Sequence, residues 1–276
     1  MSHEATELII EAGRTERNYW RDLLRYRELF YFLAWRDVLV RYKQTVIGVL
    51  WAVLRPLLTM VVFTFVFSHI AKLPAEGVPY PVMVFAAMLP WQLFATSLSE
   101  GSGSLINNSN LISKVYFPRL IVPASSVIVS FVDFAISMVL LGFLMAFYHV
   151  WPGWTLLTLP IFTALALLAS AGAGIWLAAL NVKYRDFRYV VPFIVQFGLY
   201  ISPVGFSSSI VPVKWRLLYS LNPIVGVIDG FRWAISGGNK PFPTQSLELS
   251  LITTAIVLVT GIWYFRKTER TFADVI

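Results

Sequence analysis

The sequence predicts an all-α integral membrane protein with six transmembrane helices, an amphipathic interface helix before the first of them, and short re-entrant helices between the fifth and sixth crossings. Composition is the first reason: 57% of the 276 residues are hydrophobic, 13% are charged, and the mean hydropathy is +0.69. Soluble domains average about half apolar and about one quarter charged residues. The second reason is a series of apolar runs close to the roughly 20 residues that a helix needs to cross a bilayer.

The apolar runs define the predicted crossings. Pro90, Pro160 and Pro192 fall inside or near the ends of three of them, where proline kinks or breaks a helix. The crossings are predicted at residues 46–71, 81–100, 121–148, 155–180, 189–206 and 247–265.

The chain is expected to form a single transmembrane domain over residues 1–276. We divide it into a cytoplasmic N-terminal interface region at 1–45, a six-helix membrane domain at 46–265 and a cytoplasmic tail at 266–276. The chain has no cysteine, which excludes disulfide bonds and thiolate chemistry.

The distribution of basic residues predicts the orientation. Lysine and arginine number eight in residues 14–43, two in 101–120, three in 181–188 and three in the C-terminal tail. The loops on the other side of the predicted crossings contain five. Short loops rich in these residues stay in the cytoplasm, so both termini are predicted to be cytoplasmic. The net charge of +7 then reflects topology and contact with anionic membrane lipids. No nucleic-acid partner is expected, because the basic residues do not gather on one soluble face.

The segment from Trp20 to Lys43 mixes apolar and basic side chains, and no glycine or proline occurs between Trp20 and Gly48. This pattern is typical of an amphipathic helix lying at the cytoplasmic interface. A plain membrane anchor and a lever that contacts a partner subunit are both consistent with it.

The loop at 101–120 separates two long crossings and carries a basic, aromatic motif. Asparagines at its centre can cap a new helix, and Pro118 is expected to stop that helix after two or three turns. A short helix with two aromatics and two cations fits a hydrophobic groove on another protein. Alternatively, this is an ordinary cytoplasmic loop, and its basic residues only fix the orientation of the neighbouring crossings. The candidate contact residues are Leu111, Lys114, Tyr116, Phe117, Pro118 and Arg119.

Few ionisable groups lie within the predicted crossings. Asp133 is the only acid well inside one, and it is either a structural polar contact or a position along a transport path. One isolated acid argues against an ion-coupled transporter, which needs a relay of such groups. Trp91 and Tyr200 are candidates for lining a conduit, although packing and the interfacial aromatic belt also explain such residues. The three histidines are not at metal-ligand spacing, and no catalytic arrangement is expected.

Residues 207–246 are too apolar for a solvated loop and too interrupted by proline, glycine and charge for further crossings. Short helices that dip back into the outer leaflet fit this pattern, because irregular backbone is tolerated at membrane depth where protein surrounds it. Asp229 and Arg232 are three residues apart and can pair on one helical face, or they form a surface pair of little consequence.

Five blocks of the chain carry a resemblance to a known family. They are WRDVLVRYKQTVIGVLWAVLRPLL from Trp35, FAAMLPWQLFA from Phe85, NSNLISKVYFPRLIVP from Asn108, NVKYRDFRYVVPF from Asn181 and LNPIVGVIDGFRWAI from Leu221. Together they resemble the permease subunits of ABC-2 type ATP-binding-cassette exporters. Within this family they are most similar to the permeases that export lipid-linked polysaccharide such as O-antigen. The resemblance extends from about Arg27 to Arg270.

The resemblance implies a half-transporter in the bacterial inner membrane. Two copies of this chain would form the path as a homodimer, and two copies of a separate ATPase would bind ATP and Mg, with no cofactor in this chain. The chain agrees, since it contains no G-x-x-x-x-G-K-[ST] loop. By similarity, residues 106–118 would be the coupling helix seated on the ATPase. Arg185 and Asp186 would form a second contact, although loop charge near lipid headgroups also explains them.

The resemblance also implies a substrate, a polysaccharide attached to polyprenyl diphosphate. Arg36, Arg41 and Lys43 suit the diphosphate electrostatically, and generic headgroup contact explains the same residues. In the resembled family the region 207–246 forms the external gate, which here contains Asn222, Pro223, Asp229 and Arg232.

Two alternatives remain. The same architecture can export another substrate, such as teichoic acid or a small drug. An intramembrane enzyme acting on lipid-linked sugars would need clustered acids at the membrane surface, and the sequence lacks them.

Overall fold

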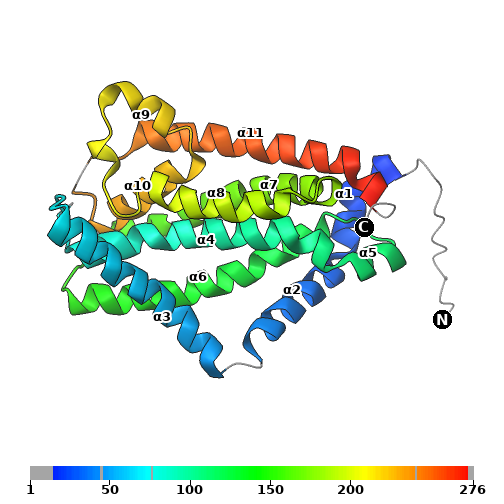
Figure 1. The fold of residues 1–276 in the computed structure, drawn as a ribbon, viewed down its shortest axis with the longest axis horizontal. Helices are drawn as coiled ribbons and strands as arrows, with labels where there is room; N and C mark the ends of the chain where they lie inside the picture. The colour runs from blue at the N-terminus through cyan, green and yellow to red at the C-terminus, as the bar shows by residue number, and fades with distance from the viewer. Residues whose placement is uncertain (1–14, 44–45, 76, 240, 273–276) are drawn as a thin grey trace.

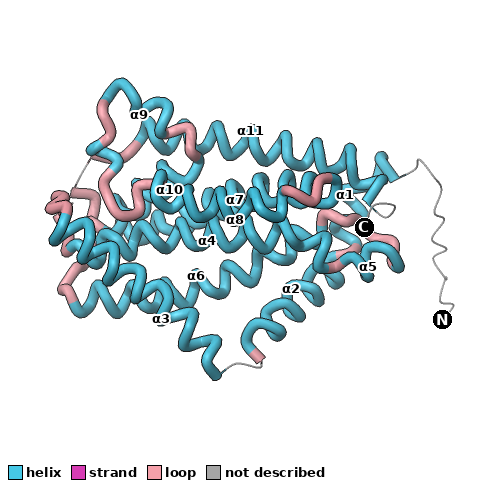
Figure 2. The backbone as a smooth tube through the Cα atoms, in the orientation of Figure 1, coloured by secondary structure: helices cyan, strands magenta, loops and turns pink. Residues whose placement is uncertain are grey.

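The computed structural model of the chain describes residues 15–43, 46–75, 77–239 and 241–272. Within these ranges all regular structure is helical and no strand occurs, as Figures 1 and 2 show. The long helices α4, α6, α7, α8 and α11 run side by side, so the connections between them gather at two ends of the bundle (Figure 1). One end holds α1 and α5, and the other holds α9 and α10. The predicted all-α class is confirmed.

The helices follow one another with short connections. The first half of the chain contains α1 (Thr15–Arg25), α2 (Arg27–Tyr42), α3 (Val46–Phe63), the π-helical η1 (Thr64–Ile70), α4 (Tyr80–Asn107) and α5 (Ser109–Lys114). The second half contains α6 (Ile121–Phe147), η2 (Gly153–Thr158), α7 (Leu159–Lys183), α8 (Phe187–Ile201), η3 (Ser208–Ile210), α9 (Val213–Tyr219), α10 (Pro223–Ile235), α11 (Thr244–Thr268) and η4 (Glu269–Thr271).

Five helical segments of the described chain are long and apolar enough to cross a membrane. They are Val53–Ile70, Tyr80–Asn107, Ile121–Phe147, Gly153–Lys183 and Thr244–Thr271, and they match five of the six predicted crossings. The remaining crossing corresponds to α8, which has only 15 residues because extended backbone begins at Ser202. At 1.5 Å per residue α8 is about 22 Å long, shorter than the roughly 30 Å of hydrocarbon. The number of crossings therefore stays a prediction.

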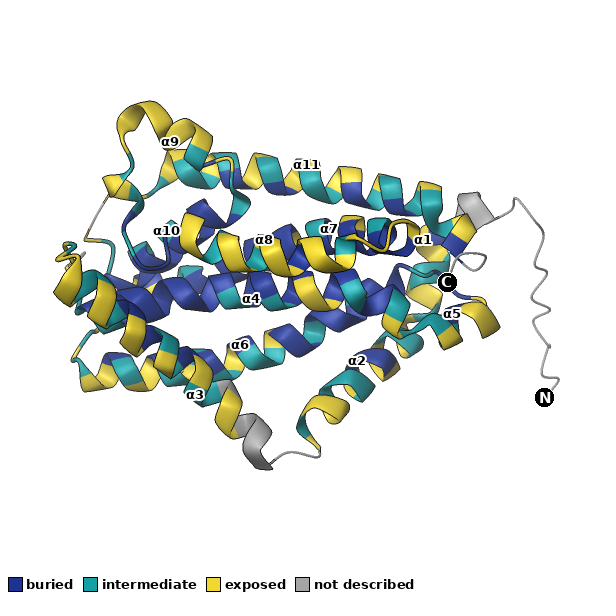
Figure 3. Ribbon diagram, viewed as in Figure 1, coloured by how far each residue is buried: buried dark blue, intermediate teal, exposed yellow. Residues whose placement is uncertain are grey.

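Helix α4 is the centre of the molecule. It contacts α3, α6, α7, α8 and α10, and its residues from Val82 to Leu89 are almost completely buried. Figure 3 shows this helix mostly dark blue, whereas α3 and α11 are mostly yellow and teal. The apolar side chains of α4 thus face protein, and those of the outer helices are left for lipid.

Two glycines allow α7 and α11 to pack closely. A Cβ atom on Gly172 would lie 2.7 Å from the Leu258 Cα, and one on Gly261 would lie 2.6 Å from the Gly172 carbonyl oxygen. Small residues at such crossings let helix backbones approach each other in membranes, where packing replaces the hydrophobic effect as the driving force.

The prediction of a single helix at Trp20–Lys43 is wrong in one respect, because the helix is interrupted at Tyr26. Tyr26 has φ −87° and ψ 21°, so α1 and α2 are separate helices. The interruption lets α1 stay at the end of the bundle, where the Arg266 guanidinium lies 4.7 Å from the Tyr19 ring centroid. Helix α2 instead packs against α6 and is inclined to the long helices of the bundle (Figure 1).

We predict that Gly261→Ala lowers the stability of the purified protein by about 1–3 kcal/mol, because the added methyl group forces α11 away from the α7 backbone. Thermal unfolding in detergent measures the change. Gly142→Ala on α6 is the matched control, since a Cβ there meets nothing within 4 Å. Equal melting temperatures for the two variants would contradict the close α7–α11 contact.

Candidate functional site: a polar cavity under helix α2

Helices α2, α4 and α6 line an open polar cavity of about 470 Å³. Such a cavity is unusual in an apolar bundle, because its walls must satisfy charged and hydrogen-bonding groups internally. The lining residues are Arg36, Asp37, Val40, Arg41, Glu100, Ser104, Asn107, Asn108, Ser126 and Val129.

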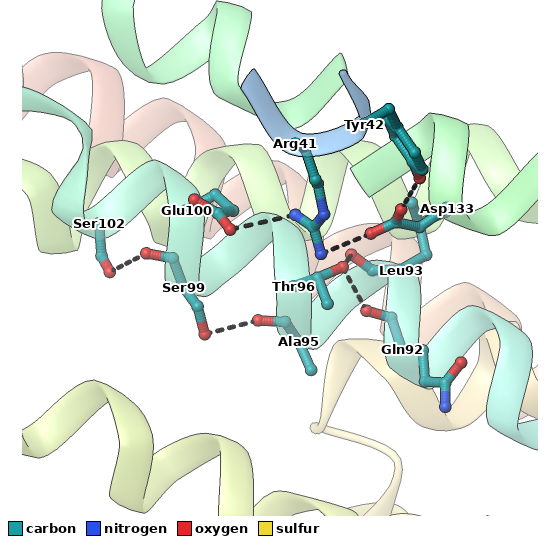
Figure 4. A network of polar contacts seen from close by, with 10 residues as sticks. All are labelled: Arg41, Tyr42, Gln92, Leu93, Ala95, Thr96, Ser99, Glu100, Ser102 and Asp133. Atoms are coloured by element: carbon teal, nitrogen blue, oxygen red, sulfur yellow. Dashed lines mark hydrogen bonds and ion pairs between the residues drawn. The ribbon is translucent and has the colours of Figure 1, made fainter. Parts of the chain in front are cut away.

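The Asp133 carboxylate holds the end of α2 against α6 (Figure 4). Arg41 Nη2 lies 2.7 Å from Asp133 Oδ2, and its Nη1 lies 3.3 Å from Glu100 Oε1. The Tyr42 hydroxyl donates a hydrogen bond to Asp133 Oδ1. Burial, together with this carboxylate, raises the pKa of Tyr42 above its ordinary value, so the hydroxyl keeps the proton that it donates. The lone acid of α6 is thus compensated by two side chains of α2.

A second polar contact joins α2 to the junction of α4 and α5. Arg36 Nη2 donates to Asn108 Oδ1 at 2.8 Å, and the same guanidinium pairs with Asp37 at 2.7 Å. Asn108 is the residue between the two helices. A displacement of α2 would therefore act directly on the segment that contains α5.

The predicted diphosphate-binding residues divide into two groups. Arg36 and Arg41 lie together on the cavity, whereas Lys43 is exposed and is not among its lining residues. Carboxylates already contact both arginines, so an anionic headgroup must compete for them. The role itself stays a prediction. Sequence reasoning missed the link between Arg41 and Asp133, although a lone acid inside an apolar span signals that a cation must be near.

The predicted coupling segment differs from a continuous helix. Helix α5 ends at Lys114, before the expected stop at Pro118, because Val115 is extended. Phe117 is only 3% exposed and lies in a core cluster with Tyr19, whereas Tyr116 is 47% exposed. Lys114 and Tyr116 form the accessible face. Phe117 and Pro118 are buried, and Leu111 is partly buried against the same cluster.

Arg119 makes contacts within the chain. Its backbone N–H donates to Glu269 Oε1 at 2.8 Å, and its guanidinium donates to the Glu269 carbonyl oxygen. These bonds fix the coupling segment to the end of α11. Glu269 did not emerge from the sequence, because the two residues are 150 positions apart and no local pattern joins them.

The second predicted contact, Arg185 and Asp186, lies in the turn between α7 and α8. Both residues are exposed. Their predicted role is consistent with this exposure and stays a prediction.

The two aromatic candidates for a conduit lie in different environments. Trp91 is 5% exposed and packs against Gly198 of α8, where a Cβ atom would lie 2.5 Å from the indole ring. Tyr200 is 63% exposed. It continues an aromatic stripe on α8 that also contains Tyr189, Phe193 and Phe197, all exposed, and the Phe193 and Phe197 ring centroids are 4.2 Å apart. We call these four residues the α8 aromatic stripe.

The predicted gate residues hold α10 in place. Asn222 caps the helix by accepting from the Ile224 N–H at 3.2 Å, and Pro223 occupies its first turn, where a missing N–H is harmless. Arg232 is buried and donates to the carbonyl oxygens of Phe206 and Val204 at 2.6 and 2.9 Å. Asp229 accepts from the Ser246 hydroxyl of α11 at 3.2 Å. These contacts connect α10 to the chain after α8 and to α11, and a gating role stays a prediction.

Comparison with known proteins identifies the family. Residues 28–236, from α2 to just beyond α10, match the ABC-2 type transporter family. The chain belongs to this family. The matched part of this ABC-2 transporter chain contains the polar cavity, α5 and the α8 aromatic stripe.

Individual relatives extend the comparison over most of the ABC-2 chain. The chain is 27% identical to the O-antigen export system permease protein RfbA of Myxococcus xanthus over 257 residues, covering 92% of this chain and 97% of RfbA. It is 19% identical to the polysialic acid transport protein KpsM of Escherichia coli over 238 residues, covering 85% and 91%. The inner membrane transport permease YadH of Escherichia coli (strain K12) is 32% identical over 109 residues, covering 38% and 40%.

We predict that Arg41 and Asp133 of the ABC-2 chain are energetically coupled by about 1–2 kcal/mol, since the pair is partly shielded from water. A double-mutant cycle with Arg41→Ala and Asp133→Ala, followed by unfolding in detergent, measures this coupling. The control cycle pairs Asp133→Ala with Lys114→Ala on α5, where additivity is expected. Additive effects in the first cycle would contradict the proposed attachment of α2.

Proposed function

We propose that this chain is the permease subunit of an exporter that moves polyprenyl-diphosphate-linked polysaccharide, of the O-antigen or capsule type, across the bacterial inner membrane. The observation that carries the proposal is similarity to O-antigen export permeases over at least 90% of both chains. The polysialic acid transporter among the relatives favours a polymer over a small drug. Teichoic acid is the closest alternative substrate, because it is also a lipid-linked polymer.

In this proposal ATP hydrolysis takes place on a separate subunit. Two copies of this chain surround the path, and two copies of the ATPase bind ATP and Mg at the α5 end. We assign that end to the cytoplasm, because the loops at 101–120 and 181–188 and the C-terminal tail contain eight of the lysines and arginines. The opposite end, with α9 and α10, faces outward and carries the external gate.

The exposed tip after α5 is the main ATPase contact in this proposal. Lys114 and Tyr116 present a cation and an aromatic ring to the partner, while Phe117 anchors the tip in the core beneath. Arg185 and Asp186 add a smaller contact. Movement of the tip reaches α2 through the hydrogen bond between Asn108 and Arg36.

The cavity beneath α2 receives the diphosphate. A diphosphate offers several oxygen acceptors to Arg36 and Arg41, and such charge-assisted pairs are stronger than neutral hydrogen bonds. The headgroup competes with Asp133 and Glu100 for Arg41, so its arrival loosens α2 from α4 and α6. The competition is reversible, because an uncompensated Asp133 inside an apolar span is unfavourable and draws Arg41 back when the headgroup leaves.

The α8 aromatic stripe lines the path for the polymer. Aromatic faces contact the C–H surfaces of sugar rings without fixed hydrogen bonds, so successive sugars can slide past them. The stripe needs a second copy of this chain to enclose it, because its four side chains are exposed in the single chain.

We predict that Tyr116→Ala abolishes most polymer-coupled ATP hydrolysis while the protein remains folded, because the ring lies on the surface. ATPase activity of the co-purified complex in lipid measures the effect. Trp151→Ala is the control, an exposed aromatic substitution in the connection after α6, at the opposite end. Phe117→Ala is expected to lower stability first, by about 3–5 kcal/mol, since it empties a buried site. Unchanged hydrolysis in Tyr116→Ala would contradict the coupling role.

We predict that the pair Phe197→Ala and Tyr200→Ala lowers polymer export while leaving ATPase association intact. Export is measured as polymer at the cell surface against lipid-linked polymer retained inside. Phe143→Ala on α6, another exposed aromatic of a membrane helix, is the control and should export normally. Normal export by the α8 variant would contradict the role of the α8 aromatic stripe. Normal export by a strain that lacks the chain would contradict the proposal of polysaccharide export.

A further inference from the structure

A second cleft, of about 980 Å³, lies at the α5 end of the bundle, between α1, the coupling segment and the end of α11. It is separate from the cavity beneath α2, since the two share no lining residue. Its walls are Tyr19, Trp20, Asp22, Tyr116, Phe117, Pro118, Arg119, Val259, Ile262, Trp263, Arg266, Lys267, Glu269 and Arg270.

The charged side of this cleft is basic. Four of its lining residues are lysine or arginine and two are acids. One of the acids, Glu269, already accepts a hydrogen bond from the Arg119 backbone. The cleft therefore favours an anion.

Aromatic rings hold two of the cations in place. The Arg266 guanidinium lies 4.7 Å from the Tyr19 ring centroid and 5.9 Å from that of Trp20. Lys267 Nζ lies 5.2 Å from the Trp263 ring centroid. Cation–π contact orients a cation without removing its charge, so both groups stay available to an anion.

The other side of the cleft is apolar and continuous with the exposed apolar face of α11. Val259 is 67% exposed and Trp263 is 62% exposed, and both belong to a helix long and apolar enough to cross a bilayer. Tryptophan next to basic residues at the end of such a helix is typical of the interface between hydrocarbon and water. The occupant of the cleft must therefore combine a hydrocarbon chain with a negative group.

We propose that this cleft binds an anionic phospholipid of the surrounding bilayer. The acyl chains lie along Val259 and Trp263, and the phosphate lies between Arg266 and Lys267. A soluble protein partner could cover the basic side but not the hydrocarbon-facing side. Basic pockets beside transmembrane helices are a recognised setting for anionic lipid headgroups. The site borders Tyr116 and Arg119, so the bound lipid supports the position of the coupling segment.

The test is lipid retention by the purified full-length chain. The protein is extracted from a bilayer that contains phosphatidylglycerol and phosphatidylethanolamine, and the bound lipids are quantified by mass spectrometry. We expect enrichment of phosphatidylglycerol in the wild type, reduced about tenfold when Arg266→Gln and Lys267→Gln are combined. The control is Lys214→Gln, whose ammonium lies 5.7 Å from the Trp215 ring centroid on α9, at the opposite end.

Three outcomes would overturn the proposal. They are equal retention of the two lipids by the wild type, unchanged retention in the double variant, and an equal loss in the control. Loss of ATPase association with lipid retention unchanged would assign the cleft to the protein partner. Displacement of phosphatidylglycerol by farnesyl diphosphate would assign it to a lipid-linked substrate.

If the double variant does not fold, a second measurement on the wild type tests the same site. Brominated phosphatidylglycerol in nanodiscs should quench the tryptophan fluorescence of the wild type more than brominated phosphatidylcholine at the same bromine density. High salt should remove the difference. No difference at low salt would contradict the site. The result does not depend on transport, so the lipid site and the export function can fail separately.

Discussion

A carboxylate inside an otherwise apolar helix is the constraint on which the half of this molecule that contains α2 and α5 depends. Asp133 must be compensated at membrane depth, and Arg41 and Tyr42 of α2 supply the compensation. The pairing draws α2 along α6 and leaves a polar cavity between them. Through Arg36 and Asn108 the same helix contacts the start of α5. One electrostatic requirement thus joins the proposed substrate entrance to the proposed ATPase contact.

The half that contains α10 depends on dense helix packing instead. Helix α10 is buried against α4, α7 and α11, and Arg232 satisfies two backbone carbonyl oxygens in the irregular chain after α8. Irregular backbone at membrane depth needs such internal partners, because lipid offers none. The two ends are therefore built differently. Ion pairs of Arg41 hold the α2 side, and an anion can compete for them. Packing and the hydrogen bonds of Arg232 hold the α10 side.

The sequence predicts the all-α class and five long helices well, because an apolar run of about 20 residues has few structural solutions in a bilayer. It predicts the site less completely. Phe117 and Tyr116 are neighbours of similar type, yet one is buried and the other exposed, and only tertiary contact with α1 decides between them. The bonds between Arg119 and Glu269 likewise join residues far apart in the chain. Helix α8 is shorter than its apolar run because the backbone becomes extended at Ser202.

If arrival of the diphosphate separates α2 from α6, a covalent link between the two helices should block export. Val40 of α2 and Val129 of α6 line the same cavity, and the chain has no native cysteine. Cysteines at these two positions would be the only thiols of the chain, so a short bis-maleimide that reacts with both links α2 to α6, and a mobility shift of the protein measures the linked fraction. We predict that joining them stops polymer export while the ATPase stays bound, and that either single-cysteine variant treated with the same reagent exports normally. Normal export by the fully cross-linked protein would contradict it.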